Sequence, residues 1–288
     1  MASSTKTISA PVIALLIGAA MWGVVWYPMR LLESEGLSGL WLTLIIYFSA
    51  LLATLPFSYR SFPELIGAPG TVVPLAIAAG WTNVAFVLAI LDGNVMRVLL
   101  LFYLSPLWAV ILGYVFLKER PSRLAWITIW VAIAGAALML WHPELGIPWP
   151  HNKADWLAMT SGFAFAVSNV VVRKAQNVSL ETKVTATWIG VLVLSFGLII
   201  LARQPMPVFT TSMMFGAVAL GILGILVMTT LVQYGVTRMP VHRSAVILLF
   251  ELVAGAISQQ LLTSETMTVV EWTGGVLIVT AAFVSSRS

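Results

Sequence analysis

The chain has 288 residues, of which 60% are hydrophobic and 9% are charged, and its mean hydropathy is +0.98. A soluble domain carries about 45–50% apolar and about 25% charged residues, so this composition excludes a soluble protein. The net charge of +4 comes from basic residues scattered through short loops rather than gathered on one face, so we expect a lipid bilayer as partner and no nucleic acid.

Ten apolar runs follow one another along the chain, each close to the roughly 20 residues that cross a bilayer as a helix. They predict an all-α integral membrane protein with ten transmembrane helices. We expect no cleaved secretory signal, because the first run is long enough to span and the residues before it are almost uncharged. The predicted spans are 11–29, 37–57, 72–91, 98–117, 124–141, 155–172, 184–202, 208–231, 244–262 and 267–284.

The loops between these spans differ in positive charge. Eleven of the 15 lysines and arginines fall on the side that would hold both termini, and four fall on the other side. Because basic loops stay in the cytoplasm, both the N-terminus and the C-terminus are predicted to be cytoplasmic.

The chain also matches itself at an offset of 146 residues, where two charged residues and a tryptophan coincide without a gap. We therefore predict two five-helix repeats, residues 1–145 and 146–288. Because five is an odd number, the second repeat crosses the membrane in the opposite direction, which makes a 5+5 inverted repeat. Such repeats give many secondary transporters two related states, with the substrate near the midplane. The matching pairs are Arg97 with Arg243, Glu119 with Glu265 and Trp126 with Trp272.

The inventory of reactive side chains gives no support to an enzyme. The chain has no cysteine, its three histidines lie in predicted loops, and no motif of a metalloprotease, a serine hydrolase or a phosphate-binding loop occurs. We therefore expect no enzymatic activity, no cofactor and no metal. A permanent aqueous channel is disfavoured, because the spans lack rings of charged side chains.

The few polar side chains inside the spans are the candidate substrate-binding residues, because each is costly in lipid unless it faces protein or water. Glu251 is a candidate for contact with a substrate ammonium group or a coupling proton, and a structural pair with a base such as Arg243 is the alternative. Three amides and several aromatic residues complete the predicted lining, with interhelical hydrogen bonding and core packing as the alternatives. These further candidates are Asn83, Asn169, Gln233, Trp22, Trp26, Tyr103, Phe165 and Tyr234.

Pro106 lies near the middle of the fourth predicted span. A proline costs a helix interior about 3 kcal/mol or more in water, but neighbouring helices in a membrane bundle can satisfy the carbonyl group that it frees. We predict a hinge beside the substrate cavity, with a static kink as the alternative. Arg97 and Arg243 are partners in the repeat on opposite sides of the membrane, so each is predicted to stabilise one closed gate.

Two passages resemble the EamA-type drug/metabolite transporter superfamily: W-G at Trp22 and Gly23, and R-x-x-L-L-x-Y-L-x-P closing on K-E-R-P-S, from Arg97 to Ser122. The stretch GNVMRVLLLFYLSPLW, residues 93–108, is most similar to the bacterial aromatic amino acid exporter branch. The resemblance covers essentially the whole chain and implies a multi-pass carrier of the cell inner membrane that exports amino acids or related metabolites. That superfamily often places Glu-Pro in the ninth span, where this chain has Glu251 and Leu252, so no bend is implied there.

The sequence thus predicts a secondary transporter that exports amino acids, with aromatic or bulky side chains preferred, by alternating access to a central cavity. The alternatives are a transporter of another metabolite or of a cationic drug, and a non-transporting membrane scaffold. Proton coupling, direction and oligomeric state are not set by the sequence, and a monomer is compatible with it.

Overall fold

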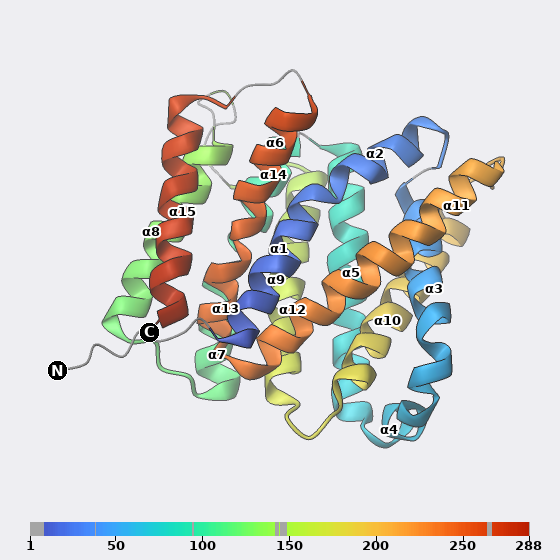
Figure 1. The fold of residues 1–288 in the computed structure, drawn as a ribbon, viewed down its shortest axis with the longest axis horizontal. Helices are drawn as coiled ribbons and strands as arrows, with labels where there is room; N and C mark the ends of the chain where they lie inside the picture. The colour runs from blue at the N-terminus through green and yellow to red at the C-terminus, as the bar shows by residue number, and fades with distance from the viewer. Residues whose placement is uncertain are drawn as a thin grey trace.

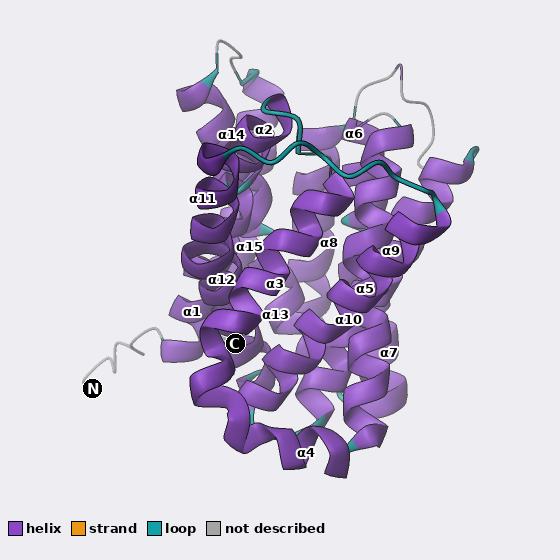
Figure 2. Ribbon diagram, turned by 90° about the vertical axis from the view of Figure 1, so that its right-hand side faces the viewer, coloured by secondary structure: helices purple, strands orange, loops and turns teal. Residues whose placement is uncertain are grey.

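The protein is described from a computed structural model that covers residues 9–37, 39–93, 95–141, 144, 149–263 and 267–287. Within these ranges every secondary-structure element is helical, and ten helical spans are long and apolar enough to cross a membrane (Figure 2). The predicted all-α fold with ten spans is therefore confirmed. Glu265, which the sequence repeat pairs with Glu119, lies outside the described residues.

Four of the ten spans are built from more than one helix. The first span is α1 and α2, the fourth is α6 and α7, the eighth is α11, η3 and α12, and the ninth is α13 and α14. In chain order the helices are α1 (Ala10–Val24), α2 (Trp26–Ser34), α3 (Gly39–Ser58), η1 (Tyr59–Ser61), α4 (Phe62–Gly67), α5 (Pro69–Asp92), α6 (Val95–Phe102), α7 (Ser105–Leu117), α8 (Arg123–Leu140), α9 (Lys153–Lys174), α10 (Leu180–Leu201), α11 (Thr211–Ala219), the π-helix η3 (Leu220–Ile225), α12 (Leu226–Arg238), α13 (Val241–Leu248), α14 (Phe250–Leu262) and α15 (Val269–Arg287).

Helix α1 begins and helix α15 ends at the same end of the bundle (Figure 1). Following the prediction from loop charge, we call this the inner end and the opposite one the outer end. The connections α3–α5, α7–α8, α9–α10 and α12–α13 lie at the inner end.

The fourth and ninth spans break at equivalent positions. In the fourth span, Pro106 has no N–H to bond the carbonyl oxygen of Phe102. A Cβ on Gly162 of α9 would lie 2.5 Å from that oxygen, so only a glycine allows α9 to approach it this closely. The ninth span breaks at Leu249, which is 146 positions after Tyr103 in the first break. The ninth span therefore bends without a proline, although the sequence did not imply it.

The helices around the centre form two groups. In the first, the α9 group, α9 packs against α5, α6 and α7; in the second, the α1 group, α1 packs against α12, α13 and α14. The pairs α3–α10 and α8–α15 lie beside these groups. Exchanging the first five spans with the last five maps the contacts of α9 onto those of α1, and it maps the α3–α10 and α8–α15 pairs onto themselves, as the proposed inverted repeat requires. Each group nevertheless takes one span from the opposite half of the sequence.

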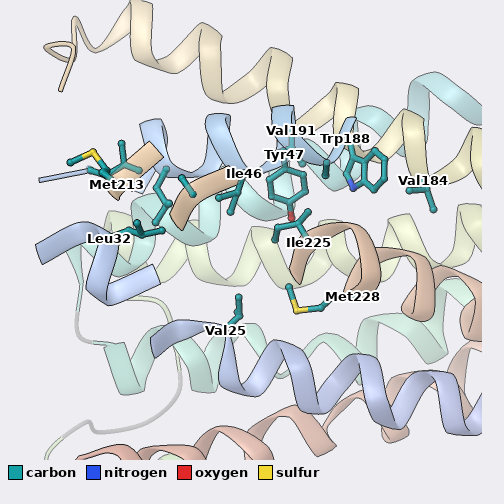
Figure 3. Close-up of a cluster of buried hydrophobic side chains, with 14 residues drawn as sticks. Val25, Leu32, Ile46, Tyr47, Val184, Trp188, Val191, Met213, Ile225 and Met228 are labelled. Atoms are coloured by element: carbon teal, nitrogen blue, oxygen red, sulfur yellow. The ribbon is translucent and has the colours of Figure 1, made fainter. Parts of the chain in front are cut away.

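Buried apolar side chains of α3, α10, α11 and η3 form one of the hydrophobic clusters (Figure 3). Trp188 is 1% exposed within it, and Tyr47 is 3% exposed. The Tyr47 hydroxyl donates a hydrogen bond to Asn83 Oδ1 at 2.9 Å. This bond connects the cluster to the wall of the central cavity.

Candidate functional site

A cavity of about 160 Å³ lies between the α9 group and the α1 group, beside the breaks of the fourth and ninth spans. Its wall combines aromatic rings with amides, hydroxyls and one carboxylate. Six of the nine predicted substrate-binding residues line it, namely Trp22, Asn83, Phe165, Asn169, Gln233 and Glu251.

Two of the amides have hydrogen-bonding capacity that the protein does not use. The side chain of Asn169 is 6% exposed, and no hydrogen bond of it is found within the described ranges. Gln233 is also 6% exposed, and its Nε2 donates to Thr187 Oγ1 at 2.7 Å. Its Oε1 has no partner among the residues described. Because an unsatisfied buried polar group costs about 1–3 kcal/mol, a polar ligand that reaches these atoms recovers that cost.

Asn83 differs from these two amides, because both ends of its side chain are engaged. Its Oδ1 accepts the hydrogen bond of Tyr47, and its Nδ2 donates to the carbonyl oxygen of Ala79 at 2.9 Å. Asn83 therefore contributes to the shape of the wall more than to free binding capacity.

Glu251 occupies the first turn of α14, because the break in the ninth span creates a new helix N-terminus there. The free N–H groups and the helix dipole at such a terminus stabilise a carboxylate. Tyr103 lies beside Glu251 in the wall of a second cavity, of about 380 Å³, which extends from the centre towards the outer end. Glu251 thus borders both cavities.

Two predicted aromatic residues lie elsewhere, and their assignment to the cavity is corrected. The indole Nε1 of Trp26 donates to Ser258 Oγ at 2.9 Å, because the first span changes direction before this residue. Tyr234 lies beneath the guanidinium group of Arg238, whose Cζ is 3.7 Å from the ring centroid. Since Gln233 faces the cavity, its neighbour points about 100° away around the helix.

The predicted hinge and gate residues do not line the central cavity. Pro106 is buried at the start of α7. Arg97 binds Asp155 at 2.8 Å, and both residues belong to the α9 group, so this ion pair does not bridge the cavity. Arg243 donates to the carbonyl oxygens of Ser285 and Ser286 at the end of α15. The suggested pairing of Arg243 with Glu251 is therefore replaced by a cap on α15.

The sequence reasoning missed the small hydroxyl residues of the cavity wall. A signal was present for the three on α5, α9 and α12, because each of them lies next to a predicted amide or four residues from one; the fourth lies on α10, which has no predicted amide. On α5, α9 and α12 the polar positions recur three or four residues from apolar lining positions. The missed residues are Thr82, Ser168, Thr187 and Thr229.

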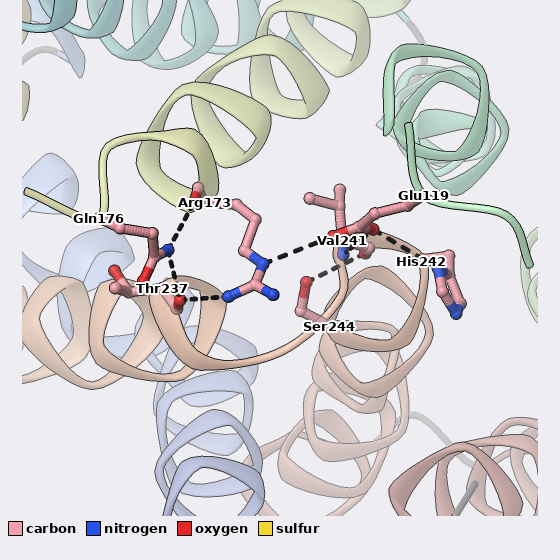
Figure 4. A network of polar contacts seen from close by, with 7 residues as sticks. All are labelled: Glu119, Arg173, Gln176, Thr237, Val241, His242 and Ser244. Carbon is pink, nitrogen blue, oxygen red and sulfur yellow. Dashed lines mark hydrogen bonds and ion pairs between the residues drawn. The ribbon is translucent and has the colours of Figure 1, made fainter. Parts of the chain in front are cut away.

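At the inner end, Glu119 joins several helices (Figure 4). Its Oε2 accepts the backbone N–H of Val241 at 2.9 Å and lies 3.6 Å from His242 Nδ1, and its Oε1 lies 3.4 Å from Arg173 Nε. The same arginine donates to the carbonyl oxygen of Thr237 at 2.8 Å. Burial raises the pKa of Glu119, but the contacts with His242, Val241 and Arg173 outweigh it and leave the pKa below its ordinary value.

A second carboxylate at the inner end, Glu64 of α4, caps the start of α10. Its Oε1 accepts the backbone N–H of Ser179 at 3.0 Å, and its Oε2 accepts the hydroxyls of Ser179 and Thr182. Burial raises the pKa of Glu64, but these hydrogen bonds and the nearby Lys183 lower it by more, so the pKa lies below its ordinary value.

Comparisons with known proteins agree with this architecture. The model of the EamA-like transporter family matches residues 9–141 and 152–287. An uncharacterised transporter of Archaeoglobus fulgidus is 26% identical over 285 residues, which are 95% of each chain. An uncharacterised transporter of Pseudomonas aeruginosa is 30% identical over 115 residues, 40% of this chain and 35% of that protein. Protein RarD of Escherichia coli is 25% identical over 131 residues, 44% of this chain and 42% of RarD. A solved structure with 17% identity covers 96% of each chain with a TM-score of 0.77, so the fold has been observed before.

Proposed function

Because the chain belongs to the EamA-like transporter family, we propose that it is a secondary transporter of the inner membrane, and not an enzyme, that moves a small molecule by alternating access. The observation that carries the proposal is the central cavity, which lies between the two helix groups and holds unused amide atoms. Movement of the α9 group against the α1 group would expose this cavity to one side of the membrane at a time.

We propose an amino acid with an aromatic or bulky side chain as the substrate. Trp22, Phe165 and the other rings of the wall give an apolar surface on which such a side chain packs. The free amide Nδ2 of Asn169 suits the substrate carboxylate, whereas the free Oε1 of Gln233 and the carboxylate of Glu251 suit its ammonium group. The proposed direction is export, by analogy with the exporter branch that the fourth span resembles.

A cationic aromatic amine is the second candidate, and the charge of the wall favours it. The residues that line the cavity include Glu251 but no lysine or arginine, within the described part of the chain. A substrate carboxylate would therefore meet only neutral donors, whereas an ammonium group would meet a carboxylate. The choice between the two classes depends on whether the carboxylate of the ligand contributes to binding.

Counterflow in proteoliposomes tests the proposal. Unlabelled phenylalanine or tryptophan inside the vesicles should accelerate the entry of the labelled compound, and phenylethylamine in the same assay tests the cationic alternative. Asn169→Leu should reduce transport with little change in thermal stability, because its amide has no partner to lose. Asn83→Leu should lower stability as well, because it leaves the Tyr47 hydroxyl unpaired. Absence of counterflow for amino acids, amines and other metabolites alike would support the scaffold alternative instead.

A further inference from the structure

The space between the two helix groups differs at the two ends of the bundle. At the outer end, α14 and α6 border the cavity of about 380 Å³. At the inner end the corresponding space between α7, α9 and α13 is filled by a cluster of small and apolar side chains. Ala109, Ala166 and Val241 in this cluster are at most 2% exposed. Between the two helix groups, the structure is therefore closed at its inner end and more open at its outer end; a cavity of about 480 Å³ at the inner end lies within the α9 group, between α5, α7 and α9.

The polar contacts of Glu119 connect the two helix groups at this closed end. It follows α7, and it accepts the first N–H of α13 and faces Arg173 at the end of α9. Arg173 then reaches the carbonyl oxygen of Thr237 at the end of α12. Since α7 and α9 belong to one group and α12 and α13 to the other, these contacts hold the two groups together (Figure 4).

The chemistry of Glu119 suits a contact that must be strong when formed. Its side chain is 16% exposed, so water competes weakly for the carboxylate. Hydrogen bonds to a charged group contribute more than neutral ones, and a helix N-terminus adds a favourable dipole. Apolar contacts of the neighbouring cluster have no such directional element, so they alone do not fix the relative position of α7 and α13.

We propose that Glu119 is the latch of the inner gate. Its contacts with α13 and Arg173 hold the inner end closed, and they must break before the central cavity opens at this end. The proposal rests on the proposed transport function for its purpose, but the latch itself is a property of the conformational equilibrium and can be measured without a substrate.

Glu64 provides a matched control. It too is a carboxylate at the inner end that accepts a helix N-terminal N–H and hydroxyl groups. It joins α4 to α10, however, and α10 packs mainly against α5 of the α9 group and against α3, so the hydrogen bonds of Glu64 do not link the ends of α7 and α9 to α12 and α13. Neutralising Glu64 should therefore weaken the fold without favouring an open inner end.

A reporter cysteine measures the opening directly, because the natural chain contains none. Ala245 of α13 is 6% exposed in the closing cluster, so Ala245→Cys should react slowly with a water-soluble maleimide. Adding Glu119→Gln should raise that rate about tenfold, which corresponds to about 1.4 kcal/mol. Adding Glu64→Gln should leave it within a factor of two of the parent rate.

A cross-link tests whether this end must open during transport. A Cβ at Gly113 of α7 would lie 3.9 Å from Val241 Cβ, and disulfides have Cβ–Cβ distances of about 3.5–4.5 Å. Oxidised Gly113→Cys/Val241→Cys protein should lose counterflow and regain it with reductant, while each single cysteine variant should keep it.

Equal maleimide rates with and without Glu119→Gln, in protein that stays monodisperse, would refute the latch whatever the transport assays show. Counterflow that persists in fully cross-linked protein would also refute it, because the inner end would then not need to open. If the maleimide rate rises as expected while no compound shows counterflow, the latch stands and the proposed transport function fails. The maleimide comparison decides the matter by itself if the double cysteine protein does not fold.

Discussion

Close contact between α5 and α10 depends on Gly190, and Gly190→Ala tests how tightly these helices are packed. A Cβ at this position would lie 1.9 Å from the carbonyl oxygen of Ala76, whereas ordinary contacts begin at 3.4 Å, so the two backbones must separate by about 1.5 Å. Because the obstacle is backbone, no side-chain rotation relieves it. Overpacking costs about 1–3 kcal/mol. The better helix propensity of alanine returns up to about 1 kcal/mol.

We therefore expect Gly190→Ala to destabilise the protein by about 1–2 kcal/mol, which lowers the melting temperature by roughly 2–8 °C. Thermal unfolding in detergent, followed by tryptophan fluorescence, measures this change. Substrate affinity should fall as well, because Asn83 of α5 and Thr187 of α10 line the central cavity. The separation of α5 from α10 would move these two side chains of the cavity wall apart.

Gly197→Ala is the matched control, two turns further along the same helix. A Cβ there meets nothing within 4 Å, so the propensity gain should leave the melting temperature unchanged or slightly raised. A melting temperature for Gly190→Ala equal to or above that of Gly197→Ala would refute the argument, because the α5–α10 contact would then have room for a methyl group.

Three further predictions concern the fourth span and the inner end. Pro106→Ala should lower the free energy of unfolding by only about 0.4–1 kcal/mol, through the entropy of the unfolded chain. Turnover in proteoliposomes should stay nearly unchanged, because the equivalent break in the ninth span forms without a proline. A selective loss of turnover would support the predicted hinge instead. Arg97→Ala should destabilise the protein by about 3–5 kcal/mol, because it leaves the buried Asp155 carboxylate without its cation; normal yield and melting temperature would contradict this. The pKa values of Glu119 and Glu64 are raised by burial but lowered more by their hydrogen bonds, so their stabilisation is complete above the ordinary glutamate pKa of about 4.3 and is lost as the pH falls through the lowered value. The melting temperature should therefore fall as the pH drops below about 4.3, and the Glu64→Gln/Glu119→Gln double variant should show a smaller fall.

The spans were predictable because lipid imposes a strong and local requirement, namely a run of apolar residues about 20 long. Their breaks were only partly predictable. Pro106 signals the break in the fourth span by removing an N–H, but nothing at Leu249 marks the equivalent break, which depends on packing between helices. Pro28 was an available signal that the first span bends, since it leaves the carbonyl of Val24 without its usual donor.

The candidate site shows the same division between local and tertiary information. Polar residues within spans identified Asn169, Gln233 and Glu251, because a polar group in a membrane protein needs a protein or water environment. Helical position was not enough to place Trp26, whose direction is set by a bend and a distant serine. The network of Glu119 was missed for a different reason, because its partners come from separate parts of the chain.

The paired breaks have an electrostatic consequence for any ligand. Helices α6 and α13 end at Phe102 and Leu248, and both of these residues line the central cavity. The C-terminal end of a helix carries a partial negative charge of about half an electron. Helices α7 and α14 begin at the same two breaks, at Ser105 and Phe250, and the N-terminal end of a helix carries the opposite partial charge. The two partial charges at each break therefore largely cancel, so the preference of the cavity for a cation depends on Glu251 and should be lost in Glu251→Gln.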